Sequence, residues 1–358
     1  RRMWIVTRHD DVDAALRDPR LSKRAPGIDA MPPALRNFVA HQMLGMDPPD
    51  HTRLRRLVSQ AFTPRLVAGM EPRIQHVADD LLDRVQLWGH LDLIDDYAYP
   101  LPLTVIAELL GIPADDHQPF RHWSYAAVAN DDPGGPVPQW RQTALTEFAA
   151  YLRELFARKR REPGNDLVSG LVTAAEGGDS LSGEELLAMV WLLIVAGHET
   201  TVNLIGNGML ALLRHPDQLA LLRAEPGLLP GAIEELLRYD GPVETSTPRY
   251  STADVDLPGG TIPAGELVFV VLASANRDEH RFADADVLDL RRADPRHLAF
   301  GKGIHYCLGA PLARMEGRIA IGTLLRRMPR LRPAVRLDAL EWRPSLLMRG
   351  LRAFPVLT

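Results

Sequence analysis

The chemistry of this chain centres on its only cysteine, Cys307, which lies in the run FGKGIHYCLG over residues 300–309. Three glycines surround it, and glycine permits positive φ angles and lets a flat partner approach the backbone closely. An amphipathic helix is predicted to begin at Pro311, directly after this run. A cysteine near a helix N-terminus is stabilised as a thiolate by the helix dipole and the free N–H groups. The run therefore indicates a reactive or metal-binding sulfur.

Three interpretations of Cys307 stay open on these residues alone. As the ligand of a haem iron, the thiolate would need backbone N–H donors that moderate its electron donation. As a nucleophile it would need a base, and His305 is close in sequence, but no third residue is in place to orient such a pair. As a structural residue it would be a small buried hydrophobe, which is the usual fate of a lone cysteine.

A second candidate is the run AGHETT over residues 196–201, inside a predicted helix over residues 182–213. Gly197 costs about 1 kcal/mol in a helix interior relative to alanine. Threonine hydroxyls there can bond the carbonyl four residues earlier and bend the helix. A glycine followed by an acid and two threonines is therefore a poor choice for a plain structural helix. The alternative interpretation is a tolerated weak point.

Charged residues at helical spacing form two further pairs. Glu235 and Arg238 are three residues apart, and such pairs usually contribute only about 0.2–0.5 kcal/mol on a solvated surface. His51 and Arg55 are one helical turn apart and face the same way. Taken singly, each basic residue is most simply a solvated surface charge.

The composition excludes several classes of protein. The chain has 358 residues, of which 46% are hydrophobic, and its net charge of -5 gives no reason to expect nucleic acid or an anionic membrane as partner. One cysteine allows no intramolecular disulfide and no cysteine-rich zinc site, and a reducing cytoplasm is the expected compartment. The most apolar stretch, residues 186–197, is too short to span a bilayer and predicts a buried helix. Because the chain opens with Arg1, we expect its native N-terminal segment to be missing.

The elements that must position these residues are mainly helical. Loops are predicted over residues 22–45 and 131–138, and a strand over residues 4–7. Short strands in hairpins are predicted over residues 243–272, where Pro-Gly and Pro-Ala-Gly turns interrupt a β-rich texture, and another hairpin over residues 344–356. Helices are predicted over residues 10–16, 50–61, 66–88, 101–110, 143–161, 182–213, 216–223, 231–239 and 311–328. The expected fold is mainly α with small β-sheets, in one domain over residues 1–358.

The run from Phe300 to Gly309 resembles the cysteine-ligand loop of the cytochrome P450 superfamily, in the form Phe-x-x-Gly-x-His-x-Cys-x-Gly. The order of the other motifs extends this resemblance over essentially the whole chain, and it is similar to the soluble bacterial, actinomycete-like branch. The resemblance implies the cytochrome P450 fold and haem b (iron protoporphyrin IX), with Cys307 as the iron ligand.

The resemblance also implies roles for the other motifs. Glu199 and Thr200 match the acid–alcohol pair that delivers protons, which is general acid catalysis. Glu235 and Arg238 match a structural pair, with Arg292 as its third member. Haem propionates need cationic partners, for which arginine is suited. The implied haem-binding set is His51, Arg55, Ala196, Gly197, Arg249, Phe300, Gly301, His305, Cys307 and Gly309.

The activity implied is a monooxygenase that inserts one oxygen atom of O2 into a C–H bond or alkene of a hydrophobic small molecule. Similarity to the soluble bacterial members suggests a secondary metabolite such as a polyketide or macrolide. Since no Gly-x-Gly-x-x-Gly run opens a βαβ unit, electrons are expected from a separate ferredoxin with its NAD(P)H-dependent reductase. The alternatives are a haem-thiolate peroxygenase, a non-catalytic haem-binding protein and a cofactor-free helical protein.

Two surfaces follow from this resemblance. The substrate pocket is expected along residues 25–46, 194–196, 243–247 and 345–348, which are mostly apolar. A docking patch for an acidic ferredoxin is expected from basic residues that flank the proximal side. These are Arg53, Arg56, Lys302, Arg314 and Arg318.

Overall fold

The computed structural model describes residues 3–24, 36, 38, 40–128, 137–176 and 179–358. Contacts divide the chain into two compact units. Unit 1 contains Arg1–Ser22, Glu71–Pro102 and Thr200–Thr358, and unit 2 contains Lys23–Met70 and Leu103–Glu199. The single domain predicted over residues 1–358 stays a prediction. Each unit is described by itself.

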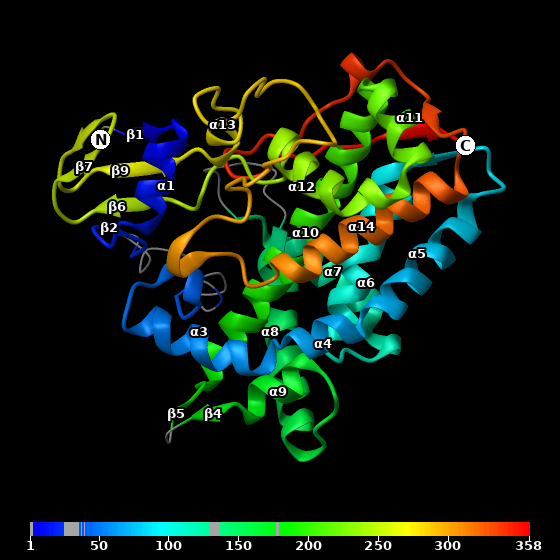
Figure 1. Ribbon diagram of the computed structural model, residues 1–358. Coiled ribbons are helices and arrows are strands. Elements are labelled where there is room, and N and C mark those ends of the chain that lie inside the picture. Colours follow the sequence, from blue (N-terminus) through cyan, green and yellow to red (C-terminus); the bar gives the residue numbers. More distant parts are fainter. Residues whose placement is uncertain (1–2, 25–35, 37, 39, 129–136, 177–178) are drawn as a thin grey trace. The chain divides into compact units, whose positions relative to one another are not determined.

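The core of unit 1 is a group of packed helices (Figure 1). Helix α14 packs against both α5 and α12. A Cβ atom at Gly317 of α14 would lie 2.9 Å from the side chain of Leu204, so this close packing requires glycine. The buried Tyr97 donates a hydrogen bond of 2.9 Å to the carbonyl oxygen of Ala320, which anchors α14 from another side. The helices of unit 1 are α1 (His9–Arg17), α5 (Glu71–Val85), α11 (Pro216–Ala224), α12 (Leu229–Asp240), α13 (Leu272–Ala275) and α14 (Ala310–Arg327).

The largest sheet of unit 1 has the strand order β1-β9-β6-β2 and lies at the left of Figure 1. Strand β1 pairs in parallel with β9, and the other pairings are antiparallel. Alternate residues of these strands face a shared apolar core with α1. The strands of unit 1 are β1 (Met3–Val6), β2 (Leu21–Ser22), β3 (His90–Asp92), β6 (Arg249–Ser251), β7 (Val255–Leu257), β8 (Gly260–Ile262), β9 (Leu267–Val270), β10 (Arg332–Pro333) and β11 (Pro355–Leu357).

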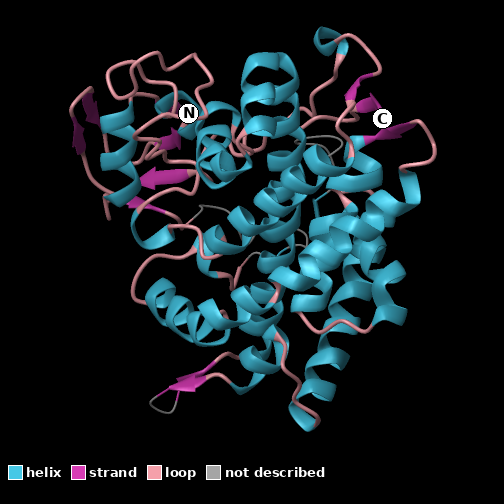
Figure 2. Cartoon of the chain, turned by 45° about the vertical axis from the view of Figure 1, so that its right-hand side comes forward, coloured by secondary structure: helices cyan, strands magenta, loops and turns pink. Residues whose placement is uncertain are grey.

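Unit 2 is almost entirely helical (Figure 2). Aromatic side chains join α7 to α8, with the ring of Trp123 4.9 Å from that of Tyr151 and 5.6 Å from that of Phe148. Its elements are α3 (Asp50–Ala61), α4 (Pro64–Gly69), α7 (His117–Val128), α8 (Gln139–Arg161), α9 (Leu167–Thr173), β4 (Ala175–Glu176) and β5 (Asp179–Ser180). Helices α6 (Pro100–Leu109) and α10 (Gly183–Arg214) run through the division between the units.

Most predicted elements are present, with two clear differences. The helix predicted over residues 66–88 is wrong, because the chain forms α4 and then α5, with Pro72 in the first turn of the second helix. Proline is tolerated there but not in a helix interior. The hairpin predicted over residues 344–356 is reduced to an isolated bridge between Trp342 and Leu351. Of the loop predicted over residues 131–138, only 137 and 138 lie in the described part.

Helix α10 is longer than its apolar stretch suggested. It runs for 32 residues, and among the described residues it is the one helix with the length and mean hydropathy, 1.4, that crossing a membrane requires. The helix is therefore longer than the apolar stretch 186–197 on which the expectation was based. However, 67% of its most apolar window is buried inside the protein. This burial agrees with the predicted core helix.

Candidate functional site

The loop that carries Cys307 is closed by its own backbone. The N–H of Cys307 donates to the carbonyl oxygen of Phe300 at 3.0 Å, and the N–H of Tyr306 donates to that of Gly303 at 3.1 Å. A further bond of 2.8 Å joins the N–H of Gly301 to the carbonyl of Leu298. Cys307 itself is half-buried and forms no disulfide. The sulfur is thus presented from a tight, internally bonded loop.

Glycine is required at two positions of this loop. Gly301 and Gly303 have φ angles of 68° and 71°, in the left-handed region that other residues rarely adopt. A Cβ atom at Gly303 would also lie 3.1 Å from the carbonyl oxygen of Leu16. At Gly309 a Cβ atom would lie 3.9 Å from the sulfur of Cys307, so glycine leaves the approach to the sulfur less crowded.

Helix α14 begins at Ala310, three residues after Cys307 and one residue before the predicted start at Pro311. It is 18 residues long and has no side-chain cap at its start. The backbone N–H of Ala313 donates to the carbonyl oxygen of Gly309 at 2.9 Å, which joins the start of the helix to the end of the cysteine loop. The positive end of a long helix therefore lies close in sequence to the sulfur and favours its anionic form.

Two basic residues of unit 1 belong to the predicted set. Arg249 of β6 is only 3% exposed, and its Nη1 donates to the carbonyl of Leu21 in β2 at 3.4 Å. Arginine is almost never fully buried unless it serves an anion or a polar network. His305 is half-buried and ends the short 3₁₀ turn Gly303–His305 in the cysteine loop.

In unit 2, His51 and Arg55 lie one turn apart on α3, as predicted. His51 is 2% exposed and Arg55 is half-buried. Burial, followed by the positive charge of Arg55, lowers the pKa of His51 below its ordinary value. The imidazole is therefore held neutral near pH 7, where it can donate one hydrogen bond and accept another.

Helix α10 changes its burial at the AGHETT run. Residues 186–192 and 201–212 are buried, but Ala196 is exposed, and Gly197, Glu199 and Thr200 are half-buried. A Cβ atom at Gly197 would lie 3.4 Å from the side chain of Ile106 in α6. The backbone stays α-helical through the run, so the helix is not interrupted there. The interior of this core helix therefore offers a short surface of small side chains next to an acid and an alcohol.

The predicted triad of Glu235, Arg238 and Arg292 is confirmed as an ion-pair cluster. Glu235 and Arg238 are each 1% exposed, and Arg238 donates to both carboxylate oxygens at 2.7 and 2.8 Å. Nε of Arg292 lies 3.1 Å from Oε2 of Glu235. Both guanidinium groups also donate to backbone carbonyls of the segment 276–287. The cluster therefore locks a long loop to α12.

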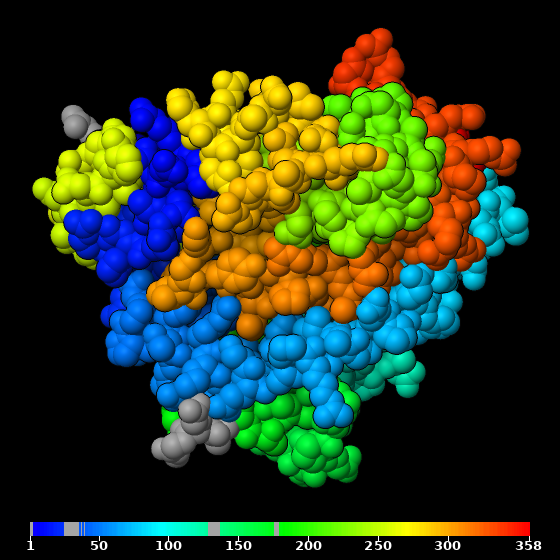
Figure 3. Space-filling view, viewed as in Figure 1, coloured from blue at the N-terminus to red at the C-terminus, as the bar shows by residue number. Residues whose placement is uncertain are grey.

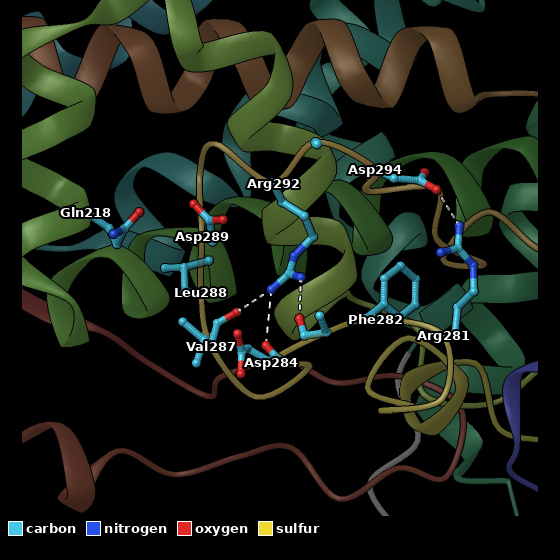
Figure 4. Close-up of a pocket in the computed structure, with 11 residues that line it drawn as sticks. Gln218, Arg281, Phe282, Asp284, Val287, Leu288, Asp289, Arg292 and Asp294 are labelled. Carbon is cyan, nitrogen blue, oxygen red and sulfur yellow. Dashed lines mark hydrogen bonds and ion pairs between the residues drawn. The ribbon is translucent and has the colours of Figure 1, made fainter.

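An open cleft of about 470 Å³ lies beside this triad (Figure 4). Arg292 reaches into it and donates to the carbonyl oxygens of Asp284 and Val287, at 3.1 and 3.0 Å. Across the cleft, Arg281 pairs with Asp294 at 2.9 Å. None of the residues predicted to bind haem lines this cleft. Among the charged residues that do line it, Arg281 and Asp294 form an ion pair with each other.

Two segments predicted to line the substrate pocket lie side by side in unit 1. Thr245 donates through its hydroxyl to the carbonyl of Leu346 at 2.8 Å, and the N–H of Glu244 donates to the carbonyl of Leu347 at 2.9 Å. Val243 and Met348 form a bridge. Of the other two predicted segments, residues 194–196 belong to α10, and most of residues 25–46 lie outside the described residues.

The five basic residues of the predicted docking patch are all engaged in ion pairs. Arg53 pairs with Asp179 and Glu185, and Arg56 approaches Asp179 at 4.0 Å. In unit 1, Lys302 pairs with Asp13, Arg314 with Glu234, and Arg318 with Glu71. The patch stays a prediction, with less net charge to offer than the sequence suggested.

One cluster beside the cysteine loop was missed. Glu234 of α12 binds Arg314 of α14, and His297 approaches the same carboxylate at 3.4 Å. The sequence analysis assigned Arg314 to a basic docking patch on the surface, and it predicted no role for Glu234 or His297. Because 80 residues separate the two ion-pair partners, no local pattern reports their contact.

A family model described as "Cytochrome P450" matches residues 138–329. Cytochrome P450 monooxygenase PikC of Streptomyces venezuelae is 50% identical to this chain, over 99% of the chain and 85% of PikC. The 6-deoxyerythronolide B hydroxylase of Saccharopolyspora erythraea is 42% identical, over 99% of the chain and 89% of that enzyme.

Comparison with solved structures also finds bacterial cytochromes P450. The solved structure of cytochrome P450 PksS, from the bacillaene polyketide synthase of Bacillus subtilis 168, superposes with a TM-score of 0.92. The two sequences are 42% identical, and the match covers 99% of this chain and 90% of PksS. The predicted fold class is thereby confirmed.

Proposed function

Since this chain belongs to the cytochrome P450 family of monooxygenases, we propose that it binds haem b through Cys307 and hydroxylates or epoxidises a polyketide-like secondary metabolite. When bound, the haem-thiolate group activates O2 so that one oxygen atom enters a C–H bond or alkene and the other leaves as water. The observation that carries the proposal is the closed cysteine loop. It offers a half-buried sulfur at the start of a long helix.

The loop residues hold the sulfur and leave room for a flat group. The Cys307 N–H is bonded to Phe300, which ties the ligand to the other end of the loop. Gly301 and Gly309 carry no side chain that would crowd the face above the loop. On α10, the small residues Ala196 and Gly197 are assigned to the same group in this proposal. Ala196 is exposed and Gly197 is half-buried within an otherwise buried helix, which supports that assignment.

The buried cations suit the two carboxylates of haem b. Arg249 is the strongest candidate, since its guanidinium is only 3% exposed and arginine is suited to bind a carboxylate with two hydrogen bonds. His51, Arg55 and His305 complete the proposed set. The lowered pKa of His51 supports a neutral imidazole that donates a hydrogen bond to a carboxylate rather than a cation that pairs with it.

Glu199 and Thr200 are the proposed catalytic pair. The two residues are neighbours on α10 and are both half-buried, so each can exchange protons with water. In this proposal the carboxyl of Glu199 takes a proton from solvent, and the hydroxyl of Thr200 passes it to the reacting oxygen by donating its own proton. A peroxide-driven enzyme would need no such pair.

The substrate class and the electron donor are the finer parts of the proposal. The names of the 6-deoxyerythronolide B hydroxylase and of PksS support a polyketide or macrolide substrate. Cytochrome P450 monooxygenases receive their electrons from redox partners, and we propose a ferredoxin with an NAD(P)H-dependent reductase. A reducing cytoplasm is the proposed location, because a chain with one cysteine has no intramolecular disulfide to maintain.

Oxygen labelling tests the function. Purified protein with a ferredoxin, its reductase, NADPH and heavy-oxygen O2 should give a product that carries one labelled atom. A product that forms only with added peroxide, or one without label, would instead support a peroxygenase. No product under either condition would support a non-catalytic haem-binding protein.

The Thr200→Ala variant tests the proton pathway, because it removes the hydroxyl but retains the small side chain. The share of NADPH consumption that ends in product should fall about 10-fold or more, because general acid catalysis typically contributes about 10²–10⁴-fold to the rate of a step. Thr200→Ser keeps the hydroxyl and should keep most of the coupling. Equal coupling in all three proteins would refute the role assigned to Thr200.

A further inference from the structure

A cluster of five side chains joins α12 and α14 to the cysteine loop, all within unit 1. Arg314 of α14 donates to both carboxylate oxygens of Glu234, from Nε at 2.7 Å and from Nη2 at 2.8 Å. Such a two-bond fork fixes the guanidinium plane as well as its position. Two aromatic residues of the loop, Phe300 and Tyr306, contact this guanidinium.

Arg314 contacts both ends of the loop. Its guanidinium carbon lies 4.5 Å from the ring centroid of Phe300, in cation–π geometry. Its Nη1 donates to the hydroxyl of Tyr306 at 3.4 Å. Phe300 accepts the backbone bond of Cys307, and Tyr306 directly precedes it. One side chain therefore braces both residues that set the position of the sulfur.

Glu234 fixes the position of the Arg314 guanidinium, and His297 in turn contacts Glu234. His297, whose side chain is 3% exposed, places Nε2 at 3.4 Å from Oε2 of Glu234 and its ring at 5.8 Å from that of Phe300. Burial would raise the pKa of Glu234, but His297 and Arg314 outweigh it and lower the pKa to about 2. The carboxylate is therefore charged throughout the range in which a P450 is handled.

Arg318 provides an internal comparison, because it lies one turn later on the same helix. It pairs with Glu71 of α5 at 2.5 Å. Among the described residues, no contact of Arg318 reaches the cysteine loop. Figure 3 shows that parts of the cysteine loop and of α14, in orange, reach the surface. The side chains of both arginines are about one-third exposed. The two residues differ in what they touch, not in charge or exposure.

We propose that Arg314 is a positioning residue that holds the Cys307 sulfur in its ligating geometry through Phe300 and Tyr306, with Glu234 as its anchor. This inference rests on the proposed role of Cys307. The positioning role replaces the predicted role of Arg314 in the docking patch, because the Arg314 guanidinium already contacts the Glu234 carboxylate and the cysteine loop.

The test uses holoprotein reduced with dithionite, which needs no protein partner, so that a docking defect cannot change the result. The carbon monoxide-bound spectrum and the reduction potential are measured for Arg314→Met and Arg314→Lys, with Arg318→Met as the matched control. On mild heating, Arg314→Met should lose its thiolate-type spectrum roughly tenfold faster than the unsubstituted protein, as expected for the loss of charge-assisted bonds. Its reduction potential should also shift.

The Arg314→Lys variant tests whether a positive charge alone restores the function of Arg314. It keeps a charge for Glu234 but loses the planar fork, and it should lie between Arg314→Met and the unsubstituted protein. Arg318→Met should match the unsubstituted protein in both spectrum and potential. If Arg314→Met does not accumulate with haem, Glu234→Gln replaces it, because this substitution releases the same guanidinium without a change in side-chain size.

Two outcomes separate this inference from the proposed function. If the unsubstituted protein shows no thiolate-type spectrum, the role of Cys307 is wrong. If it shows that spectrum and Arg314→Met or Glu234→Gln behaves like Arg318→Met, the positioning role alone is wrong. Slower reduction by ferredoxin in Arg314→Met, with an unchanged dithionite spectrum, would return Arg314 to the docking patch.

Discussion

Two adjacent glutamates on α12 hold two different clusters. Glu235 is 1% exposed and is enclosed by Arg238, Arg292 and the backbone of a long loop. Glu234 is one-quarter exposed and binds Arg314 beside the cysteine loop. The first cluster ties α12 to a long loop, and the second meets the residues that present Cys307. Burial and contacts, rather than residue type, separate a structural ion pair from one that can tune a site.

The largest expected effect is at the buried cluster. Glu235→Gln removes the charge that two guanidinium groups share, and an uncompensated buried charge costs about 3–5 kcal/mol. The free energy of unfolding, measured by urea denaturation with circular dichroism, should fall by that amount, or the variant should not accumulate as holoprotein. A loss below about 1 kcal/mol, the range of a solvated surface pair, would mean that the cluster does not lock the fold.

A third acid sharpens the comparison because it forms no ion pair with any residue that the structure describes. Glu316 of α14 is fully buried, and its Oε2 has no hydrogen-bond partner in the described part of the chain. Burial raises its pKa from 4.5 to about 8. The folded state thus binds a proton that the unfolded state releases, so stability should fall as pH rises from about 4.5 to 8.

The Glu316→Gln variant removes this dependence. At pH 8 it should be more stable than the unsubstituted protein by about 1–3 kcal/mol, since an amide of the same size has no charge to bury. At pH 5 the two proteins should be nearly equal. Urea denaturation at both pH values measures the difference, and a less stable variant at pH 8 would contradict the assignment of a neutral, unpaired carboxyl.

The smallest expected effect is at the partly exposed cluster of Glu234 and Arg314. Glu234→Gln should lower stability at pH 7 by only about 1 kcal/mol, because solvent screens the Arg314 pair. The pKa of Glu234 is depressed to about 2, so its contribution is present above the unfolded value of 4.5 and is lost as pH falls toward 2.

The same variant should therefore differ from the unsubstituted protein at pH 7 and match it near pH 2, if both remain folded enough to measure. A difference that stays constant between those pH values would show that the ion pair is not its cause. A loss as large as that of Glu235→Gln would erase the distinction between the two clusters.

The sequence was sufficient where a local pattern decides the structure. The helix predicted over residues 50–61 is α3 with the same bounds, because Pro49 and Asp50 start it and the apolar spacing continues to Ala61. The glycines of the cysteine loop were identified for the same reason. Positive φ at Gly301 and Gly303 is a local demand.

The sequence was insufficient where distant residues decide. Neither α7 nor α9 was predicted, since their short, mixed sequences are stabilised mainly by packing against α8. Adjacent acids such as Glu234 and Glu235 look alike in sequence, and only the fold assigns each its arginine. The same holds for Arg314, whose sequence neighbourhood gives no sign of an anchor 80 residues away.

The central claim is that Cys307 is the iron ligand, and the carbon monoxide-bound spectrum of the reduced protein tests it most directly. The unsubstituted protein should show the red-shifted Soret maximum of thiolate ligation, and Cys307→Ser should lose it while the overall helix content is kept. A maximum typical of imidazole ligation in the unsubstituted protein, or a thiolate-type maximum that survives in Cys307→Ser, would contradict the account.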